Sequence, residues 1–79
     1  MQHISERMTM KVGDLVREDW PAGRLGVVIS KIRRSTPRDN HELGVMYGDV
    51  HPVVDVLLIG ATVRGVYDID TLELINESR

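Results

Sequence analysis

The residues that indicate the fold most strongly are Met10-Lys11-Val12-Gly13-Asp14-Leu15-Val16-Arg17, followed by Gly23-Arg24-Leu25-Gly26-Val27-Val28-Ile29-Ser30-Lys31-Ile32. The first run suits a short strand with a polar edge. Within the second run, residues 25–32 are rich in Val and Ile, which are enriched in strands, and are expected to form one strand. Residues 18–23 between them contain Pro and Gly, the residues that most often mark a turn. Two strands joined in this way are typical of the start of a small β-barrel.

The second half of the chain predicts a hairpin and a closing strand. Residues 53–59 form a strongly apolar run, and residues 62–67 suit a strand that returns from a tight turn at Gly60-Ala61. Residues 68–71 suit a 3₁₀ turn, in which Asp68 or Asp70 caps exposed amides. A final short strand is expected over residues 72–75.

Residues 33–52 are expected to form one long connection, which contains Pro37, Gly44, Gly48 and Pro52. A connection of this length is uncommon in a compact domain and is usually functional or mobile. A short strand over residues 43–47 fits within it.

These elements predict an all-β fold, a small five-stranded, partly open barrel with one long loop and one 3₁₀ turn. Residues 10–79 are expected to form a single domain, preceded by a flexible arm over residues 1–9, which have no periodic pattern. Because no long segment has a helical period, the pattern speaks against an all-helical fold.

Composition limits the classes of function. The chain has 79 residues, a net charge of −2 and no cysteine, so disulfides, thiolate metal sites and a cysteine nucleophile are excluded. No apolar run approaches the roughly 20 residues of a membrane helix, and nothing resembles a signal peptide. We therefore expect a cytoplasmic protein with no membrane partner and no cofactor.

The order of elements resembles the SH3-like barrel, and residues 12–17 with residues 23–28 resemble a KOW-type strand–turn–strand element. Met10-Lys11-Val12-Gly13-Asp14-Leu15-Val16-Arg17 and Leu72-Glu73-Leu74-Ile75-Asn76-Glu77-Ser78-Arg79 are similar to small uncharacterised proteins of tailed bacteriophages, notably of marine cyanobacteria. The phage resemblance implies the cytoplasm of a host cell. The KOW resemblance implies nucleic-acid or ribosomal partners. Aromatic residues are too few to pave the polyproline groove of peptide-binding SH3 domains.

One basic cluster stands at the start of the long connection and consists of Lys31, Arg33, Arg34 and Arg38. Such a cluster suits contact with phosphates of a nucleic acid. It equally suits a solvated loop base whose charges pair with nearby carboxylates such as Asp39 or Glu42.

Apolar residues outside the expected core indicate a protein interface. Both faces of the strand over residues 53–59 are mostly apolar, whereas a barrel strand normally presents polar residues outward. The excess suits cover by the long connection or by another chain. Trp20 suits either a partner contact or a plug in one end of the barrel. The predicted interface residues are Trp20, Met46, Tyr47, Val53, Leu57 and Ile59.

The sequence predicts neither a metal site nor catalysis. His41, Asp49 and His51 share the long connection, but their spacing matches no familiar zinc motif. Ser35 with Asp39 and His41 contains the residue types of a hydrolase triad, yet nothing places the serine on a strained turn. We therefore expect a non-enzymatic protein-interaction or assembly module that self-associates or binds another protein. The alternative is a nucleic-acid-binding module that uses the basic cluster.

Overall fold

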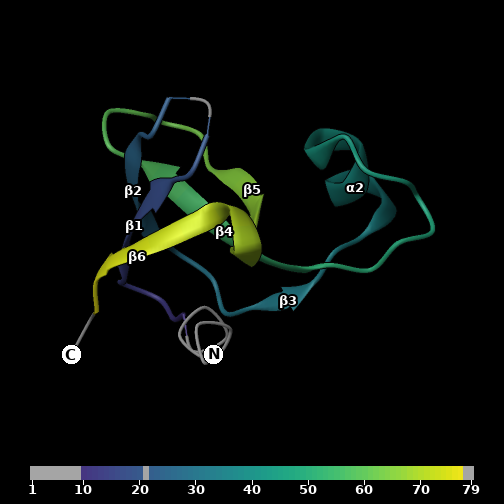
Figure 1. Cartoon of the computed structure of the whole chain (residues 1–79), viewed down its shortest axis with the longest axis horizontal. Coiled ribbons are helices and arrows are strands. Elements are labelled where there is room, and N and C mark those ends of the chain that lie inside the picture. Colours follow the sequence, from purple (N-terminus) through teal and green to yellow (C-terminus); the bar gives the residue numbers. More distant parts are fainter. Residues whose placement is uncertain (1–9, 21, 78–79) are drawn as a thin grey trace.

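The computed structural model describes residues 10–20 and 22–77 (Figure 1), so the arm expected over residues 1–9 lies outside the described residues. The elements in this part of the chain are β1 (Leu15–Glu18), β2 (Leu25–Val28), β3 (Arg33–Arg34), α2 (Pro37–Leu43), β4 (Pro52–Leu58), β5 (Gly65–Asp68), the 3₁₀ turn η1 (Ile69–Thr71) and β6 (Leu72–Asn76). The prediction of an all-β fold is confirmed, with one short helix added within the described residues.

The strands form a single antiparallel sheet in the order β3-β4-β2-β1-β6, and β5 pairs with β4. Val56 of β4 pairs with Val28 of β2 and with Gly65 of β5, so β2 and β5 lie on opposite edges of β4. Val53 likewise pairs with Arg33 of β3 and with Asp68. The sheet is open in the described residues, and it has six strands rather than the five expected, because the two-residue β3 pairs with the start of β4.

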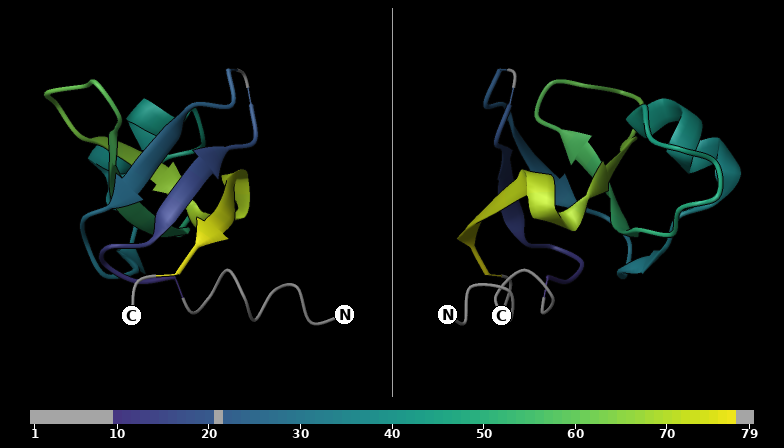
Figure 2. Two further views of the ribbon diagram at one scale, coloured as in Figure 1. Left: turned by 90° about the vertical axis from the view of Figure 1, so that its left-hand side faces the viewer. Right: turned by 45° about the vertical axis from the view of Figure 1, so that its right-hand side comes forward.

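The core lies on the concave side of this curled sheet, between β6-β1-β2 and β4-β5 (Figure 2). Alternation along the strands places Val16, Val28 and Val56 inward, and each is almost completely buried. Ile69 of η1 and Leu72 of β6 complete this core. The expected 3₁₀ turn is confirmed, and the side chain of Asp68 caps it by accepting a hydrogen bond from the Asp70 amide.

The prediction of a short strand over residues 43–47 is wrong, because residues 44–47 form no strand; the long connection instead contains the helix α2 over Pro37–Leu43. Thr36 and Asp39 form a reciprocal capping box at the start of α2, and Pro37 occupies its first turn. Gly44 ends the helix with a φ of 75°, in the left-handed region that glycine adopts without strain. Seven residues are too few for an apolar period to be visible, so only the caps indicated this helix.

Three strand boundaries also differ from the prediction. The second strand, expected over residues 25–32, ends at Val28. The expected first strand begins only at Leu15, because Asp14 closes a turn on Lys11: its amide donates to the Lys11 carbonyl at 3.1 Å, and its carboxylate accepts from the Lys11 amide at 2.9 Å. The turn at Gly60-Ala61 is present, but β5 begins at Gly65 instead of residue 62. Residues 59–64 therefore form a longer connection than a tight hairpin.

The helix α2 lies to one side of the sheet, beyond β5 and away from β1 and β6 (Figure 1), and it contacts β5. Within the described residues, no helix is both long and apolar enough to cross a membrane.

A substitution at Gly26 tests the close approach of β2 to β4. A Cβ at this position would lie 2.7 Å from Val56 Cγ1 and 3.0 Å from the Leu57 carbonyl oxygen. Gly26→Ala is expected to lower the free energy of unfolding by about 1–3 kcal/mol, because the backbones must separate. Urea denaturation measures the change. Gly48→Ala is the control, since its Cβ would meet no atom within 4 Å; an equal loss in both variants would contradict the close approach.

Candidate functional site

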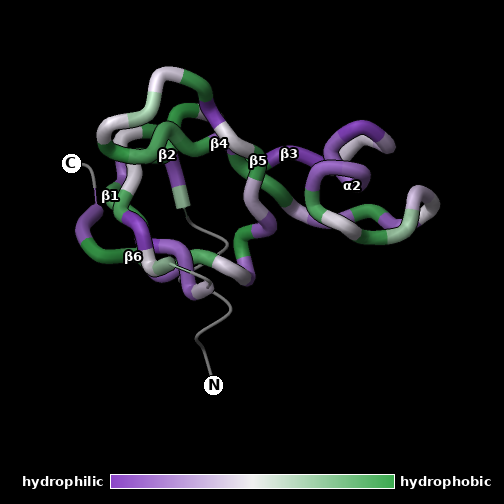
Figure 3. Tube along the Cα trace, turned by 90° about the horizontal axis from the view of Figure 1, so that it is seen from above, coloured by the Kyte–Doolittle hydropathy of each residue, from purple (hydrophilic) through white to green (hydrophobic). Residues whose placement is uncertain are grey.

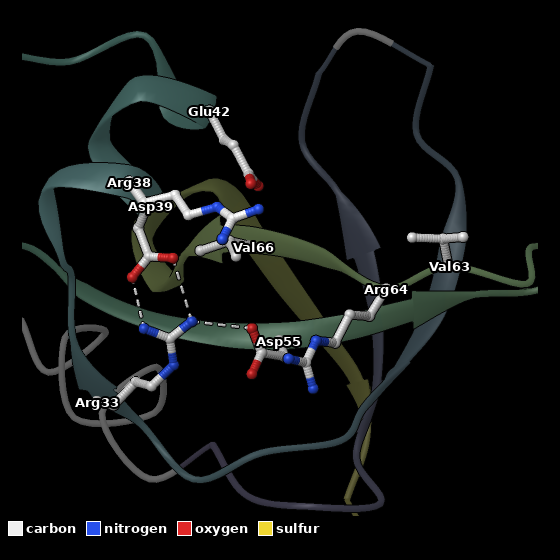
Figure 4. Close-up of a pocket in the computed structure, with 8 residues that line it drawn as sticks. All are labelled: Arg33, Arg38, Asp39, Glu42, Asp55, Val63, Arg64 and Val66. Atoms are coloured by element: carbon white, nitrogen blue, oxygen red, sulfur yellow. Dashed lines mark hydrogen bonds and ion pairs between the residues drawn. The ribbon is translucent and has the colours of Figure 1, made fainter.

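A polar cleft lies between α2, β4 and the connection from β4 to β5 (Figure 4). Its volume is about 310 Å³, near the lower end of the range for small-ligand sites. The residues that line it are Arg33, Arg38, Asp39, Glu42, Asp55, Val63, Arg64 and Val66. Six of these eight side chains are charged, so the cleft is built for polar contacts.

Arg33 connects the long connection to the sheet across the floor of this cleft. Its guanidinium donates to Asp39 of α2 at 2.5 Å and to Asp55 of β4 at 3.0 Å. The Arg33 hydrogen bonds lower the pKa of Asp39 to about 2, and the two carboxylates raise the pKa of Arg33. We call this ion-pair network, formed by Arg33, Asp39 and Asp55, the Arg33 latch.

The basic cluster predicted from the sequence does not form one surface. Arg33 is held in the latch, which matches the alternative of a loop base paired with carboxylates. Arg38 lines the cleft, while Lys31 and Arg34 are exposed elsewhere on the chain and do not line it. Arg64, which the sequence argument missed, joins Arg38 at the cleft from residues far along the chain. No local signal marks Arg64, because only the pairing of β4 with β5 brings it there.

A second network involves Tyr67, which follows Val66 in β5 and therefore points to the other face of the strand. Glu18, only 3% exposed, accepts two hydrogen bonds at 3.0 Å from the Arg24 guanidinium and one at 2.6 Å from the Tyr67 hydroxyl. The hydrogen bonds from Arg24 lower the pKa of Glu18 to about 2. Burial, together with the hydrogen bond to Glu18, raises the pKa of Tyr67 to about 12. This network ties the loop between β1 and β2 to β5.

The loop held by Glu18 carries Trp20, whose side chain is 80% exposed. The alternative in which Trp20 plugs one end of the barrel is therefore wrong. The core instead closes with aliphatic residues such as Ile69 and Leu72, together with half-buried Tyr67.

The connection after α2 presents Met46 and Tyr47, which are 74% and 65% exposed. The side-chain amide of buried Asn40 donates to the carbonyl oxygens of both residues, at 3.0 and 3.1 Å, and to that of Asp49 at 2.7 Å. These hydrogen bonds from Asn40 attach residues 46–49 to α2.

Val53, predicted as an interface residue, is completely buried. It lies on the same face of β4 as Asp55 and Leu57, and the long connection covers this face at the start of the strand. Leu57 and Ile59, beyond that cover, are 37% and 68% exposed. The predicted interface residues thus come from three separate segments. Leu57 near the end of β4 and Ile59 just after it are the two exposed residues from the third segment.

Leu57 belongs to a row of apolar side chains on the outward side of the sheet. Leu15 pairs with Val27, and Val27 pairs with Leu57, so the three lie on one face across β1, β2 and β4. The Ile59 amide donates to the Leu25 carbonyl at 2.9 Å, which extends this face. We call these five residues the outer apolar face; Figure 3 shows the hydrophobic colour gathered over β2 and the end of β4.

The histidines of the long connection are not arranged as a metal site. His51 Nδ1 lies 3.0 Å from Asp68, and its Nε2 lies 3.8 Å from Asp49. His41 instead lies edge-on to the ring of Tyr47. Over residues 10–20 and 22–77, no group of three His, Cys, Asp or Glu side chains has metal-ligand geometry.

Comparison with family models, curated proteins and solved structures gave no match to this chain.

Arg33→Gln tests the latch. The substitution leaves two buried carboxylates without their guanidinium, and we expect a loss of about 1–3 kcal/mol in the free energy of unfolding, because Arg33 itself is partly exposed. Chemical denaturation measures this, and the amide spectrum of α2 should shift. Arg34→Gln, at an exposed neighbour, should change stability by no more than about 0.5 kcal/mol. Equal effects would show that the latch contributes nothing specific.

Glu18 predicts an acid-dependent loss of stability. Its pKa is about 2 in the folded protein and 4.5 ordinarily, so its stabilising contribution is complete above about pH 4.5 and disappears as the pH falls towards 2. Glu18→Gln should be less stable than the parent protein at pH 7, and its free energy of unfolding should fall less on acidification. The lowered pKa of Asp39 accounts for the pH dependence that remains. Denaturant midpoints from pH 7 to pH 2 measure this. The control is Glu73→Gln, because the exposed pair of Glu73 with Arg17 contributes little. If the stability of Glu18→Gln depended on pH as steeply as that of the parent protein, Glu18 would not be the source of the acid-dependent loss.

Proposed function

We propose that this protein is a non-enzymatic protein-interaction module that acts in assembly and self-associates through the outer apolar face. The observation that carries the proposal is the register of Leu15, Val27 and Leu57 across three strands, with Leu25 and Ile59 beside them. Soluble monomers seldom leave a large contiguous apolar patch in water. A second protein surface laid on these strands would remove that patch from solvent.

A second copy of the chain is the partner that the surrounding charges favour. Arg17 pairs with Leu25 in the sheet, and its guanidinium lies 3.4 Å from Glu73 of β6. Both side chains are about half exposed. In a two-fold dimer each patch meets its own copy, so Arg17 of one protomer can face Glu73 of its partner. The same edge thus supplies both charges that a self-complementary interface requires.

The alternative function, nucleic-acid binding, stays a prediction with a changed set of residues. Because Arg33 is held by Asp39 and Asp55, only Lys31, Arg34 and Arg38 of the predicted cluster remain for phosphate contacts. Nothing in the arrangement of these three favours it over self-association.

Ile59→Glu tests self-association, and Val63→Glu is its matched control. Both are β-branched residues of the same connection, 68% and 78% exposed, but Val63 lines the cleft instead of the outer apolar face. Sedimentation velocity over a range of concentrations should show dimers for the parent and for Val63→Glu. Ile59→Glu should weaken dimerisation at least about tenfold, because a carboxylate would be buried without a partner.

A parent protein that stays monomeric at high concentration would overturn self-association. Equal weakening by both substitutions would place the interface elsewhere.

A further inference from the structure

The arginines of the described residues divide into two groups. Arg17, Arg24 and Arg33 each have a carboxylate partner. The side chains of Arg34, Arg38 and Arg64 have neither a hydrogen bond nor an ion pair within residues 10–20 and 22–77, and two of these three line the same cleft. Unmatched guanidinium groups brought together from distant parts of an acidic chain call for a counter-charge.

The cleft offers few carboxylates for that purpose. Both oxygens of Asp39 accept from Arg33, and Asp55 accepts from the same guanidinium. Asp55 uses only one oxygen for this bond, so its second oxygen and the whole carboxylate of Glu42 are left for Arg38 and Arg64 among the lining residues. Figure 4 shows Arg38 and Glu42 entering from α2 at the upper left and Arg64 from the right, with Arg33 at the lower left. Outside the latch, the lining has two cationic groups and one anionic group, and the latch itself has one guanidinium and two carboxylates.

We infer that this cleft binds a phosphate monoester group between Arg38 and Arg64. A guanidinium donates two parallel hydrogen bonds to phosphate oxygens, and two guanidinium groups match the dianionic charge of a monoester at neutral pH. The only apolar lining residues, Val63 and Val66, provide too little surface to hold an apolar ligand. The volume of about 310 Å³ suits a small phosphorylated molecule.

The Arg33 latch has a positioning part in this site. By holding Asp39 of α2 to Asp55 of β4, it fixes the helix that carries Arg38 relative to the strand that leads to Arg64. It also engages both oxygens of Asp39 and one oxygen of Asp55, which would otherwise compete with the ligand for Arg38 and Arg64. The site is distinct from the outer apolar face, so it stands or falls independently of self-association.

The test is a titration of the ¹⁵N-labelled full chain at pH 7.5, at constant ionic strength, with three probes: inorganic phosphate, adenosine monophosphate and dimethyl phosphate. Inorganic phosphate and the nucleotide should shift the amides around Arg38 and Arg64. Dimethyl phosphate, a monoanionic diester, should bind at least about fivefold more weakly, because it presents one charge to two guanidinium groups. Tighter binding of the nucleotide than of phosphate would identify a nucleotide as the source of the group, and equal binding would identify free phosphate.

Four variants locate the site. Arg38→Gln and Arg64→Gln should each weaken phosphate binding at least about fivefold, through loss of charge-assisted hydrogen bonds. Glu42→Gln should strengthen it about twofold, because a competing carboxylate is removed. Arg34→Gln removes the same charge from an arginine outside the cleft and should leave affinity unchanged within about twofold.

Three results would overturn the inference. The first is the absence of cleft shifts at tens of millimolar phosphate. The second is equal weakening by Arg34→Gln and the cleft variants, which would indicate general charge attraction. The third is equal affinity for the diester, which would indicate a nucleic-acid backbone contact instead.

Discussion

The burial of β4 is the constraint on which the rest of the structure depends. This strand pairs with β2, β3 and β5. Its four consecutive residues 53–56 are all buried, so both faces of the strand are covered there. One face fills the concave core. The other needs a second cover, and the excursion from β3 through α2 supplies that cover over the first half of the strand. The second half has no cover within the described residues, and the outer apolar face begins there.

The carboxylate of Asp55, on the covered face of β4, determines how the connection from β3 through α2 is attached to the sheet. Asp55 is buried among valines, and a buried carboxylate is costly unless it is paired. Arg33 provides the pairing, and because a guanidinium has several donors it reaches Asp39 at the same time. Asp39 in turn caps α2 through the Thr36 amide. One buried carboxylate on the sheet thus specifies where a short helix begins and where it lies. Such pairs contribute modestly to stability, and their larger effect here is to select one placement of the connection.

The strands with a regular alternation of residues and the turns with typical turn residues were predictable from the sequence. Alternation and β-branched residues mark β2 and β4, Gly60-Ala61 marks a turn, and Asp68 marks the 3₁₀ turn before β6. The two-faced pattern of residues 53–59 also indicated excess apolar surface, although it did not indicate which half is covered. Val53 and Ile59 have equivalent places in that pattern, yet one is completely buried and the other is exposed. Val53 lies within β4 between β3 and β5, whereas Ile59 follows the end of the strand, and this difference depends on contacts between residues far apart in the chain.

The candidate sites show the same limit more sharply. A charge cluster is visible in sequence as a count of Lys and Arg, but its chemistry depends on which charges already have partners. Arg33 and Arg38 belong to one cluster by sequence, whereas the fold commits the first to two carboxylates and leaves the second without one. Arg64, isolated in sequence, becomes the counterpart of Arg38 because β5 returns alongside β4. Pairing within the protein therefore removes charge from the surface selectively, and the arginines that remain unmatched are a better guide to a ligand than the density of basic residues along the chain.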